Sequence, residues 1–154
     1  MNQLHQLVVF TLDEQRYAVP LSAVERIVRM VEITLVPKTP EIVLGVINAQ
    51  GWIIPVVDIR RRFRLPARVP QLGDQLLIAH ASKRPVALVV DAVTEVVTLS
   101  DQEMVRGETI LAHLDYLTGV LKGPDGLILV HDLDSFLSLE EEQALHDAIE
   151  SMTL

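Results

Sequence analysis

The pattern of apolar and polar residues predicts a protein built from many short strands. The clearest signal is the stretch from Gly45 to Ile59, GVINAQGWIIPVVDI, where two apolar runs flank Gly51 and Asp58 ends the second run. A glycine between two apolar runs permits a tight reversal, so this stretch predicts a β-hairpin. The segment GVLKGPDGLILVHDL, at residues 119–133, repeats the same plan. The repetition predicts a duplicated β unit.

The rest of the chain predicts more strands of this kind, each an apolar run bounded by turn residues or prolines. These runs fall at residues 7–12, 16–19, 32–36, 74–80, 86–91 and 93–99. Many short strands with few helices are typical of small barrels rather than of a parallel sheet covered by helices. The predicted fold class is therefore all-β.

Helices are predicted where a serine precedes a glutamate by three residues, which is the pattern of a capping box. This pattern begins at Ser22, Ser100 and Ser138. The first case predicts a short helix that carries three apolar residues on one face, namely Val24, Ile27 and Val28. The second predicts at most one helical turn. The third opens an amphipathic C-terminal helix with apolar positions at Leu145, Ala148, Ile149 and Met152.

Composition narrows the class of protein. A chain of 154 residues with 49% apolar and 22% charged residues is expected to fold as a single domain over residues 1–154. Its net charge of −8 argues against binding nucleic acid through a positive surface. The absence of cysteine excludes disulfides and thiolate metal sites. No signal peptide or membrane-spanning run is visible, so we expect a cytoplasmic protein without direct membrane insertion.

Candidate chemistry is sparse. The five histidines form no i, i+4 pair and no HExxH motif, and no phosphate-binding glycine loop is present, so neither a metal nor a cofactor is expected. Asp91 and Asp132 each end an apolar run. Two carboxylates that meet in a cleft could perform acid–base catalysis, whereas aspartates at strand ends more simply form turns or cap helices.

Two further features indicate surfaces for partners. Arg60, Arg61, Arg62 and Arg64 form a basic cluster in an acidic chain. The cluster is either a solvated face or a docking site for an acidic partner, because guanidinium groups pair well with carboxylates. Trp52 lies in a predicted strand where a smaller residue would serve, and it becomes an interface candidate if it is exposed.

The central stretch GVINAQGWIIPVVDIRRRF resembles GVxNLRGxIxPVxDLRxxF, the signature of the CheW family of adaptors in bacterial chemosensory arrays. Further segments are similar to the family pattern: LVVFTL at residues 7–12, YAVPL with VERI at 17–27, and ALVVDAV at 87–93. YLTG followed by LILV and DLD, at residues 116–134, is similar to its closing segment. The resemblance covers nearly the whole chain.

This resemblance implies two swapped, SH3-like, five-stranded β-barrels with short helices, a C-terminal α-helix and no enzyme activity. It also implies two partners, a CheA-type histidine kinase and the cytoplasmic tip of chemoreceptors. The receptor would bind an apolar groove between the barrels, at positions matching Val8, Leu21, Val24, Ile27, Val96 and Thr98. The kinase would bind another surface within residues 33–43, represented by Ile33, Val36, Ile42 and Val43.

Two positions depart from the family pattern. Gln50 stands where an arginine is usual in Asn-Leu-Arg-Gly, and Arg26 stands where a glutamate is common. In relatives, the arginine and the glutamate at these positions could form a charge pair. Replacing both of them avoids leaving one charge unpaired in a partly buried site. Alternatively, the double change marks altered receptor specificity in a chemosensory pathway that does not control motility. We treat four residues as a candidate interface: Arg26, Asn48, Gln50 and Trp52.

Overall fold

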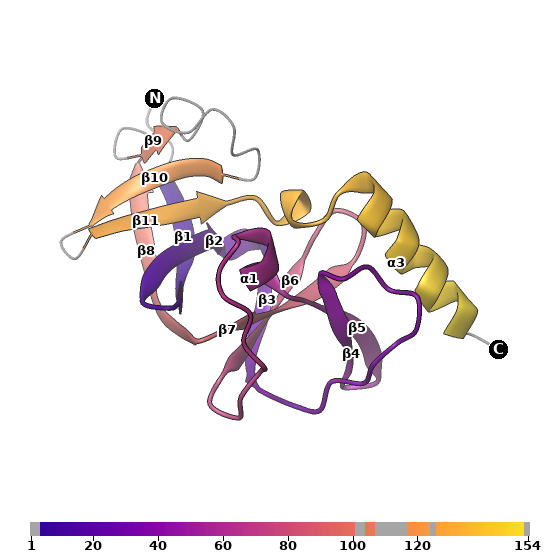
Figure 1. Ribbon diagram of the computed structural model, residues 1–154. Helices are drawn as coiled ribbons and strands as arrows, with labels where there is room; N and C mark the ends of the chain where they lie inside the picture. The colour runs from indigo at the N-terminus through magenta and orange to yellow at the C-terminus, as the bar shows by residue number, and fades with distance from the viewer. Residues whose placement is uncertain (1–3, 101–103, 107–116, 124–125, 153–154) are drawn as a thin grey trace.

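The computed structural model describes residues 4–100, 104–106, 117–123 and 126–152 (Figure 1). The first of its two sheets has six strands, in the order β8 (Ala92–Ser100), β1 (Leu4–Leu12), β2 (Gln15–Pro20), β11 (Gly126–His131), β10 (Leu117–Gly123) and β9 (Met104–Arg106). The second has five strands, in the order β3 (Val24–Arg29), β6 (Gln75–His80), β7 (Pro85–Val90), β5 (Trp52–Val57) and β4 (Val43–Ala49). The mainly β fold predicted from the sequence is confirmed.

The helical elements are few. A short helix, α1, spans Ile59–Arg62, and 3₁₀ turns span Leu21–Ala23 and Leu133–Phe136. The one long helix in the described part of the chain is α3, at Leu139–Met152, which lies beside the second sheet (Figure 1).

The two sheets exchange a strand. β3 follows the β1–β2 hairpin along the chain but pairs with β6 of the second sheet, and β8 follows the β6–β7 hairpin but pairs with β1 of the first. Each sheet is then completed by a parallel pairing, β5 with β7 and β11 with β2. The predicted swapped arrangement of two SH3-like units is therefore present. The first sheet also carries the short strand β9 at its edge.

The two predicted hairpins are present and match in detail. β4 and β10 have seven residues each, and β5 and β11 have six. The pairing register shifts at Gly45 in one hairpin and at Gly119 in the other. After each hairpin an aspartate, Asp58 or Asp132, accepts a hydrogen bond from a backbone N–H of the helical turn that follows. These matching bulges and caps support the duplication inferred from the repeated sequence.

Each sheet encloses its own apolar cluster, and a third, larger cluster joins the two. This shared core contains residues from both sheets and from the C-terminal segment, among them Phe10, Leu12, Leu77, Leu88, Phe136 and Leu145. Because the strands alternate their side chains, β1 supplies Val8 and Phe10 to the shared core and Leu7 and Val9 to the first sheet's own cluster. The two units therefore share one interior.

The helix predicted after Ser22 is wrong, because this segment forms β3. β3 carries a bulge between Val24 and Arg26. Val24, before the bulge, pairs with Ala79, and Ile27, after it, pairs with Leu77, so both lie on one face of the sheet. The bulge therefore places residues three apart on the same face, which is the spacing that imitated a helix. The strand predicted at residues 32–36 is also wrong, since only Thr34 forms a bridge, to Val46.

The predicted C-terminal helix is confirmed with its capping box. The Glu141 N–H donates to Ser138 Oγ over 3.1 Å, and the Ser138 N–H donates to Glu141 Oε1 over 2.8 Å. The helix buries Leu145 in the shared core and packs Ala148 in a cluster with Val36 and Val46. The turn predicted after Ser100 falls on residues 101–103, outside the described residues.

Candidate functional site

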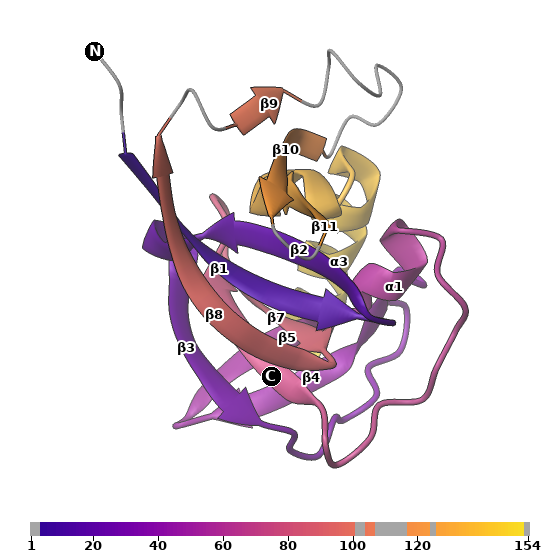
Figure 2. The same ribbon diagram turned by 90° about the vertical axis from the view of Figure 1, so that its left-hand side faces the viewer.

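The shared core reaches the surface where the two swapped strands run along the edges of their sheets (Figure 2). On β8, Val96 pairs with the core residue Val8 and is 53% exposed. On β3, Ile27 pairs with the core residue Leu77 and is 39% exposed. Directly paired residues share one face of a sheet, so Val96 and Ile27 both extend the shared core outward.

The 3₁₀ turn at Leu21–Ala23 joins β2 to β3. Leu21 and Val24 are partly buried and pack against the shared core. Thr98 pairs with Gln6 and is exposed, on the same face of β8 as Val96. We call the surface formed by Leu21, Val24, Ile27, Val96 and Thr98 the seam. Five of the six residues predicted to bind a receptor lie on it, whereas Val8 is only 1% exposed and forms its buried floor.

The candidate interface at the β4–β5 turn is presented to solvent. Gln50 and Gly51 both have positive φ, +53° and +88°, as a two-residue type I′ turn requires. Asn48 Oδ1 accepts a hydrogen bond of 2.9 Å from the Gly51 N–H and so fixes the turn. Trp52 follows with 73% of its surface exposed, and Ile53 is 51% exposed. Tryptophan is enriched at binding hot spots, so its exposure makes Trp52 an interface candidate.

Arg26, the fourth candidate, lies on β3 and points to the opposite face of the sheet from Ile27. It is half-buried, and its Nε atom is buried without a hydrogen-bond partner in the described part of the chain. Among the described residues, no hydrogen bond or ion pair joins Arg26 to Gln50, so the suggested compensation between these two positions stays a prediction.

The residues predicted to bind a kinase are mostly buried. Ile42 and Val43 are 2% and 6% exposed and belong to the shared core, and Val36 is 8% exposed against α3. Ile33 is half-buried. The same segment instead presents Leu35, which is 81% exposed and which the sequence analysis did not single out. Nothing in the local sequence could have indicated it, because the bridge from Thr34 to Val46 that orients this segment is a pairing with a distant strand.

The arginine cluster does not act as one surface. Arg60 is only 5% exposed, and its guanidinium donates to Asp13 over 2.8 Å and to Asp91 over 2.9 Å. Arg68, from the following loop, donates to Asp91 over 2.6 Å and to Asp74 over 2.9 Å. We call these five residues the arginine–aspartate network. A solvated face is therefore the wrong interpretation for Arg60.

The other arginines of the cluster have separate roles. Arg62 donates to the Phe136 carbonyl over 2.9 Å and pairs with Glu141, so it ties α1 to the start of α3. Arg61 pairs with Glu41 over 2.9 Å at the surface, where both side chains are more than half exposed. Arg64 is exposed with a φ of +59°.

The model of the CheW-like domain family matches residues 6–141. This chain belongs to that family. It is similar to Chemotaxis protein CheW of Rhizobium meliloti, with 32% identity over 90% of this chain and 91% of the relative. It is also similar to Chemotaxis protein CheW of Klebsiella aerogenes, with 27% identity over 94% and 87%. Among solved structures, scaffolding protein TtCheW from Thermoanaerobacter tengcongensis matches with a TM-score of 0.81 and 28% identity, over 90% of this chain and 96% of that one.

In this CheW-like chain two residues of the segments that resemble the family pattern, Arg60 and Asp91, belong to the arginine–aspartate network. Burial acts to raise the pKa of Asp91, but hydrogen bonds from the Asp13 N–H, Arg60 and Arg68 outweigh it and hold that pKa below its ordinary value. The hydrogen bond from Arg60 lowers the pKa of Asp13 in the same way. Both carboxylates therefore stay ionised and hold the β1–β2 turn, α1 and the β7–β8 junction together.

The two aspartates considered for catalysis are engaged separately in the CheW-like fold. Asp91 belongs to the network, whereas Asp132 Oδ1 accepts a hydrogen bond from the Asp134 N–H and caps the 3₁₀ turn at Leu133–Phe136. Their contacts are those of structural residues at strand ends. Within the described residues, no group of three or more histidine, aspartate or glutamate side chains could hold a metal ion, and no helix is long and apolar enough to cross a membrane.

Proposed function

We propose that this chain is a non-enzymatic adaptor that couples chemoreceptors to a CheA-type histidine kinase. Membership of the CheW-like family, together with relatives named as chemotaxis and scaffolding proteins, supports the general role. The observation that carries the proposal is the seam, where core residues of both units continue into the exposed side chains of Ile27 and Val96. The protein would work in the cytoplasm and reach the membrane only through its partners.

The seam suits the cytoplasmic tip of a receptor. A helical tip with an apolar stripe would cover Ile27 and Val96. It would also contact Leu21 and Val24, which pack against the shared core. Because β3 and β8 are each hydrogen-bonded to a neighbouring strand, they are already ordered, and the chain loses little conformational entropy when a receptor binds. The adaptor thus needs no conformational change of its own, and receptor state would shift the population of kinase states.

The kinase would bind at the segment that leads into β4. Leu35 offers an exposed apolar side chain there, and Lys38 and Glu41 are exposed beside it. Since β4 lies at the edge of the second sheet opposite to β3, this surface is separate from the seam. One adaptor could then hold both partners at once, and linked sites in an array would raise the effective concentration of each.

A second candidate is an adaptor of a pathway that does not control motility. It is favoured by Gln50 at the exposed turn and by Arg26, whose Nε has no hydrogen-bond partner among the described residues, since both residues differ from the usual family pattern. A receptor that matches this chain would then carry a different polar residue opposite the turn. Crosslinking from Gln50 and from Arg26 to receptor and kinase tests this, and contact with neither partner would remove both positions from the interface.

The proposed sites are tested by two variants with opposite expected effects. Ile27→Glu should weaken binding of a receptor tip about tenfold or more, because a charged group would have to be desolvated within an apolar contact. It should leave kinase binding unchanged. Leu35→Glu should weaken kinase binding to a similar degree and leave binding of the receptor tip unchanged. Calorimetric titration with each partner, taken from the same genome, measures both.

Each variant serves as the matched control for the other, since both replace an exposed apolar residue by glutamate. Both should keep their unfolding midpoint, because exposed positions rarely change stability by more than about 0.5 kcal/mol. Loss of both binding activities in one variant, or none in either, would contradict the separation of the two sites. Unfolding of Ile27→Glu would show that the seam is part of the core.

A further inference from the structure

The apolar surface of the seam continues along β3 beyond Ile27 and meets a basic residue there. Arg29 is exposed two residues after Ile27, and Val31 follows with 44% of its surface exposed. Val28 and Met30, which lie between them, pack against the second sheet's own apolar cluster. Because side chains alternate along an extended chain, Ile27, Arg29 and Val31 share the opposite face. Arg29 is therefore an exposed cation between two exposed apolar side chains.

The sheet beneath Arg29 is polar and already ordered. Arg29 pairs with Gln75 of β6, just as Ile27 pairs with Leu77. Gln75 is half-buried, and its Oε1 accepts a hydrogen bond of 2.7 Å from the Val93 N–H near the start of β8. This bond ties β6 to β8 across the seam. A surface that is ordered in advance loses little entropy when a partner binds.

The charge of Arg29 is not neutralised within the described part of the chain. No ion pair between described residues includes Arg29, and Glu32, three residues further on, does not contact it as a salt bridge. The acidic residues of β3, β8 and the β7–β8 junction already have partners: Glu25 contacts His80, Glu95 pairs with Arg16, and Asp91 pairs with Arg60 and Arg68. A carboxylate from a partner would therefore not have to displace one of the chain's own.

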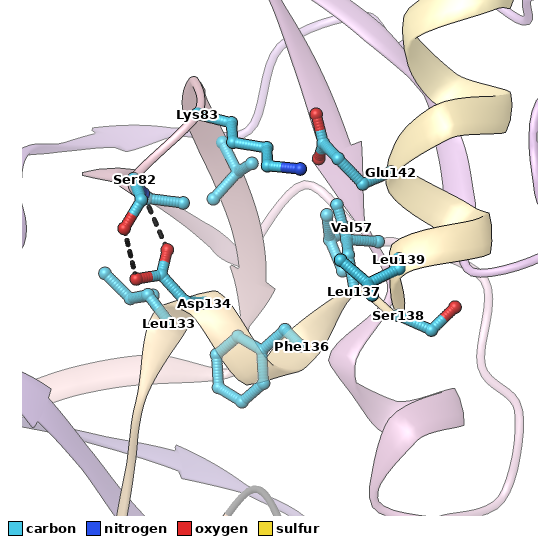
Figure 3. A pocket seen from close by; sticks show the side chains of 12 residues that line it. Val57, Ser82, Lys83, Leu133, Asp134, Phe136, Leu137, Ser138, Leu139 and Glu142 are labelled. Atoms are coloured by element: carbon cyan, nitrogen blue, oxygen red, sulfur yellow. Dashed lines mark hydrogen bonds between the residues drawn. The ribbon is translucent and has the colours of Figure 1, made fainter.

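Lys83, another basic residue beside an apolar surface, is in a different situation. It lines a pocket of about 230 Å³ at the start of α3 and extends toward Glu142 (Figure 3). The apolar walls of this pocket include Val57, Val86, Leu133, Phe136 and Leu137. Glu142 also accepts a hydrogen bond of 2.8 Å from Arg84. The basic groups at this pocket thus face a carboxylate of the same chain, whereas Arg29 faces solvent.

We infer that Arg29 binds a carboxylate at the edge of the receptor tip's apolar stripe and so selects among receptors. This inference rests on the proposed function of the seam. A helix rises about 5.4 Å per turn, and two residues of a strand span roughly 6.6–6.8 Å. In a helix that runs along β3, an aspartate or glutamate one turn beyond the residue over Ile27 therefore comes within reach of the Arg29 guanidinium. A tip with a lysine or arginine there would be repelled.

Calorimetric titration with the cytoplasmic tip of a receptor from the same genome measures the contribution of Arg29. Arg29→Gln should weaken binding about threefold to tenfold, and Arg29→Glu should weaken it more than about tenfold, because the attraction becomes a repulsion. Raising the salt concentration from about 50 to about 500 mM should weaken binding of the unmodified chain more than that of Arg29→Gln, since salt screens an exposed ion pair.

Arg64→Glu is the matched control. Arg64 is an exposed arginine outside the seam, and its replacement changes the net charge by the same amount as Arg29→Glu. Arg64→Glu should bind the receptor tip like the unmodified chain. An equal loss of affinity in Arg64→Glu and Arg29→Glu would overturn the inference, because it would show that only the net charge of the chain matters.

Exchanging the two charges shows whether the contact is direct. The acidic residues beside the apolar stripe of the tip are replaced by lysine one at a time, and one of these tips should bind Arg29→Glu more tightly than it binds the unmodified chain. If the unmodified chain binds the natural tip but no lysine tip restores binding to Arg29→Glu, the inference is wrong and the proposed function stands. If the unmodified chain binds no tip at all, both are wrong.

Discussion

Replacing Arg60 by methionine is expected to lower the free energy of unfolding by about 3 kcal/mol, as is typical when one partner of a buried ion pair is removed. Arg60 is 5% exposed and donates to both Asp13 and Asp91. Methionine fills a similar space without a charge, so the two carboxylates would face each other with only Arg68 left to offset Asp91. The value lies at the low end of the range because the carboxylates keep some contact with water. Urea unfolding measures the change.

The neighbouring arginine provides the control. Arg61 pairs with Glu41 at the surface, and Arg61→Met should change stability by less than about 1 kcal/mol because exposed ion pairs contribute little. Equal effects of the two substitutions would show that burial of Arg60 does not matter. A neutral Arg60→Met would contradict the network itself.

The network also sets how stability depends on pH. The pKa values of Asp13 and Asp91 lie below their ordinary value of 3.8 in the folded chain. A lowered folded-state pKa means that the unfolded chain binds protons first as the pH falls, so this stabilisation is complete well above 3.8 and is lost progressively below about pH 4. The Arg60→Met variant should lose less stability over the same window, because the hydrogen bonds that lower these pKa values are reduced.

Replacing Gly45 by alanine is expected to destabilise the fold by about 3 kcal/mol, the combined effect of a strained φ and of overpacking. Gly45 has a φ of +153°, which residues with a side chain rarely adopt. A Cβ atom there would lie 2.3 Å from the Thr34 carbonyl oxygen and 2.8 Å from Ile33 Cγ2. Because the first contact is with backbone, the segment before β4 would have to move and its bridge to Val46 would break.

Two other glycines separate the causes of this effect. Gly51 has a φ of +88° but nothing within 4 Å of an added Cβ, so Gly51→Ala should cost only the backbone strain, about 1–2 kcal/mol. Gly73 has neither constraint, and Gly73→Ala should be close to neutral. Thermal unfolding of the three variants should follow this order. A Gly45→Ala protein as stable as Gly73→Ala would show that the segment at Ile33 and Thr34 does not pack as described.

The strands and hairpins were predictable because alternation and turn residues are local. The repeated hairpin could be read from its glycines and closing aspartates, and the C-terminal helix from its capping box. The helix predicted after Ser22 failed because a bulge in β3 imitates helical spacing, and nothing in the segment itself reports its pairing with β6. Strand exchange and the sixth strand are likewise properties of distant pairings, and only the family resemblance indicated the former.

Candidate sites were harder to predict because exposure is a tertiary property. A family resemblance indicates which positions match a site, but it does not say whether the side chains there are exposed. Val8, Ile42 and Val43 were therefore predicted as site residues although their side chains are buried. Leu35 was not singled out, since an exposed and a buried leucine look alike in a sequence. Arg60 seemed equivalent to its neighbours until Asp13 and Asp91, both distant in the chain, were found beside it.

We propose that two separate surfaces of this chain hold a receptor and a kinase together. The most direct test is to saturate the protein with the cytoplasmic tip of its receptor and then titrate the kinase's regulatory domain, following the mass of the complex by sedimentation. We expect a ternary complex, with an affinity for the kinase that changes little when the receptor is present. Displacement of one partner by the other, or binding of neither, would contradict it.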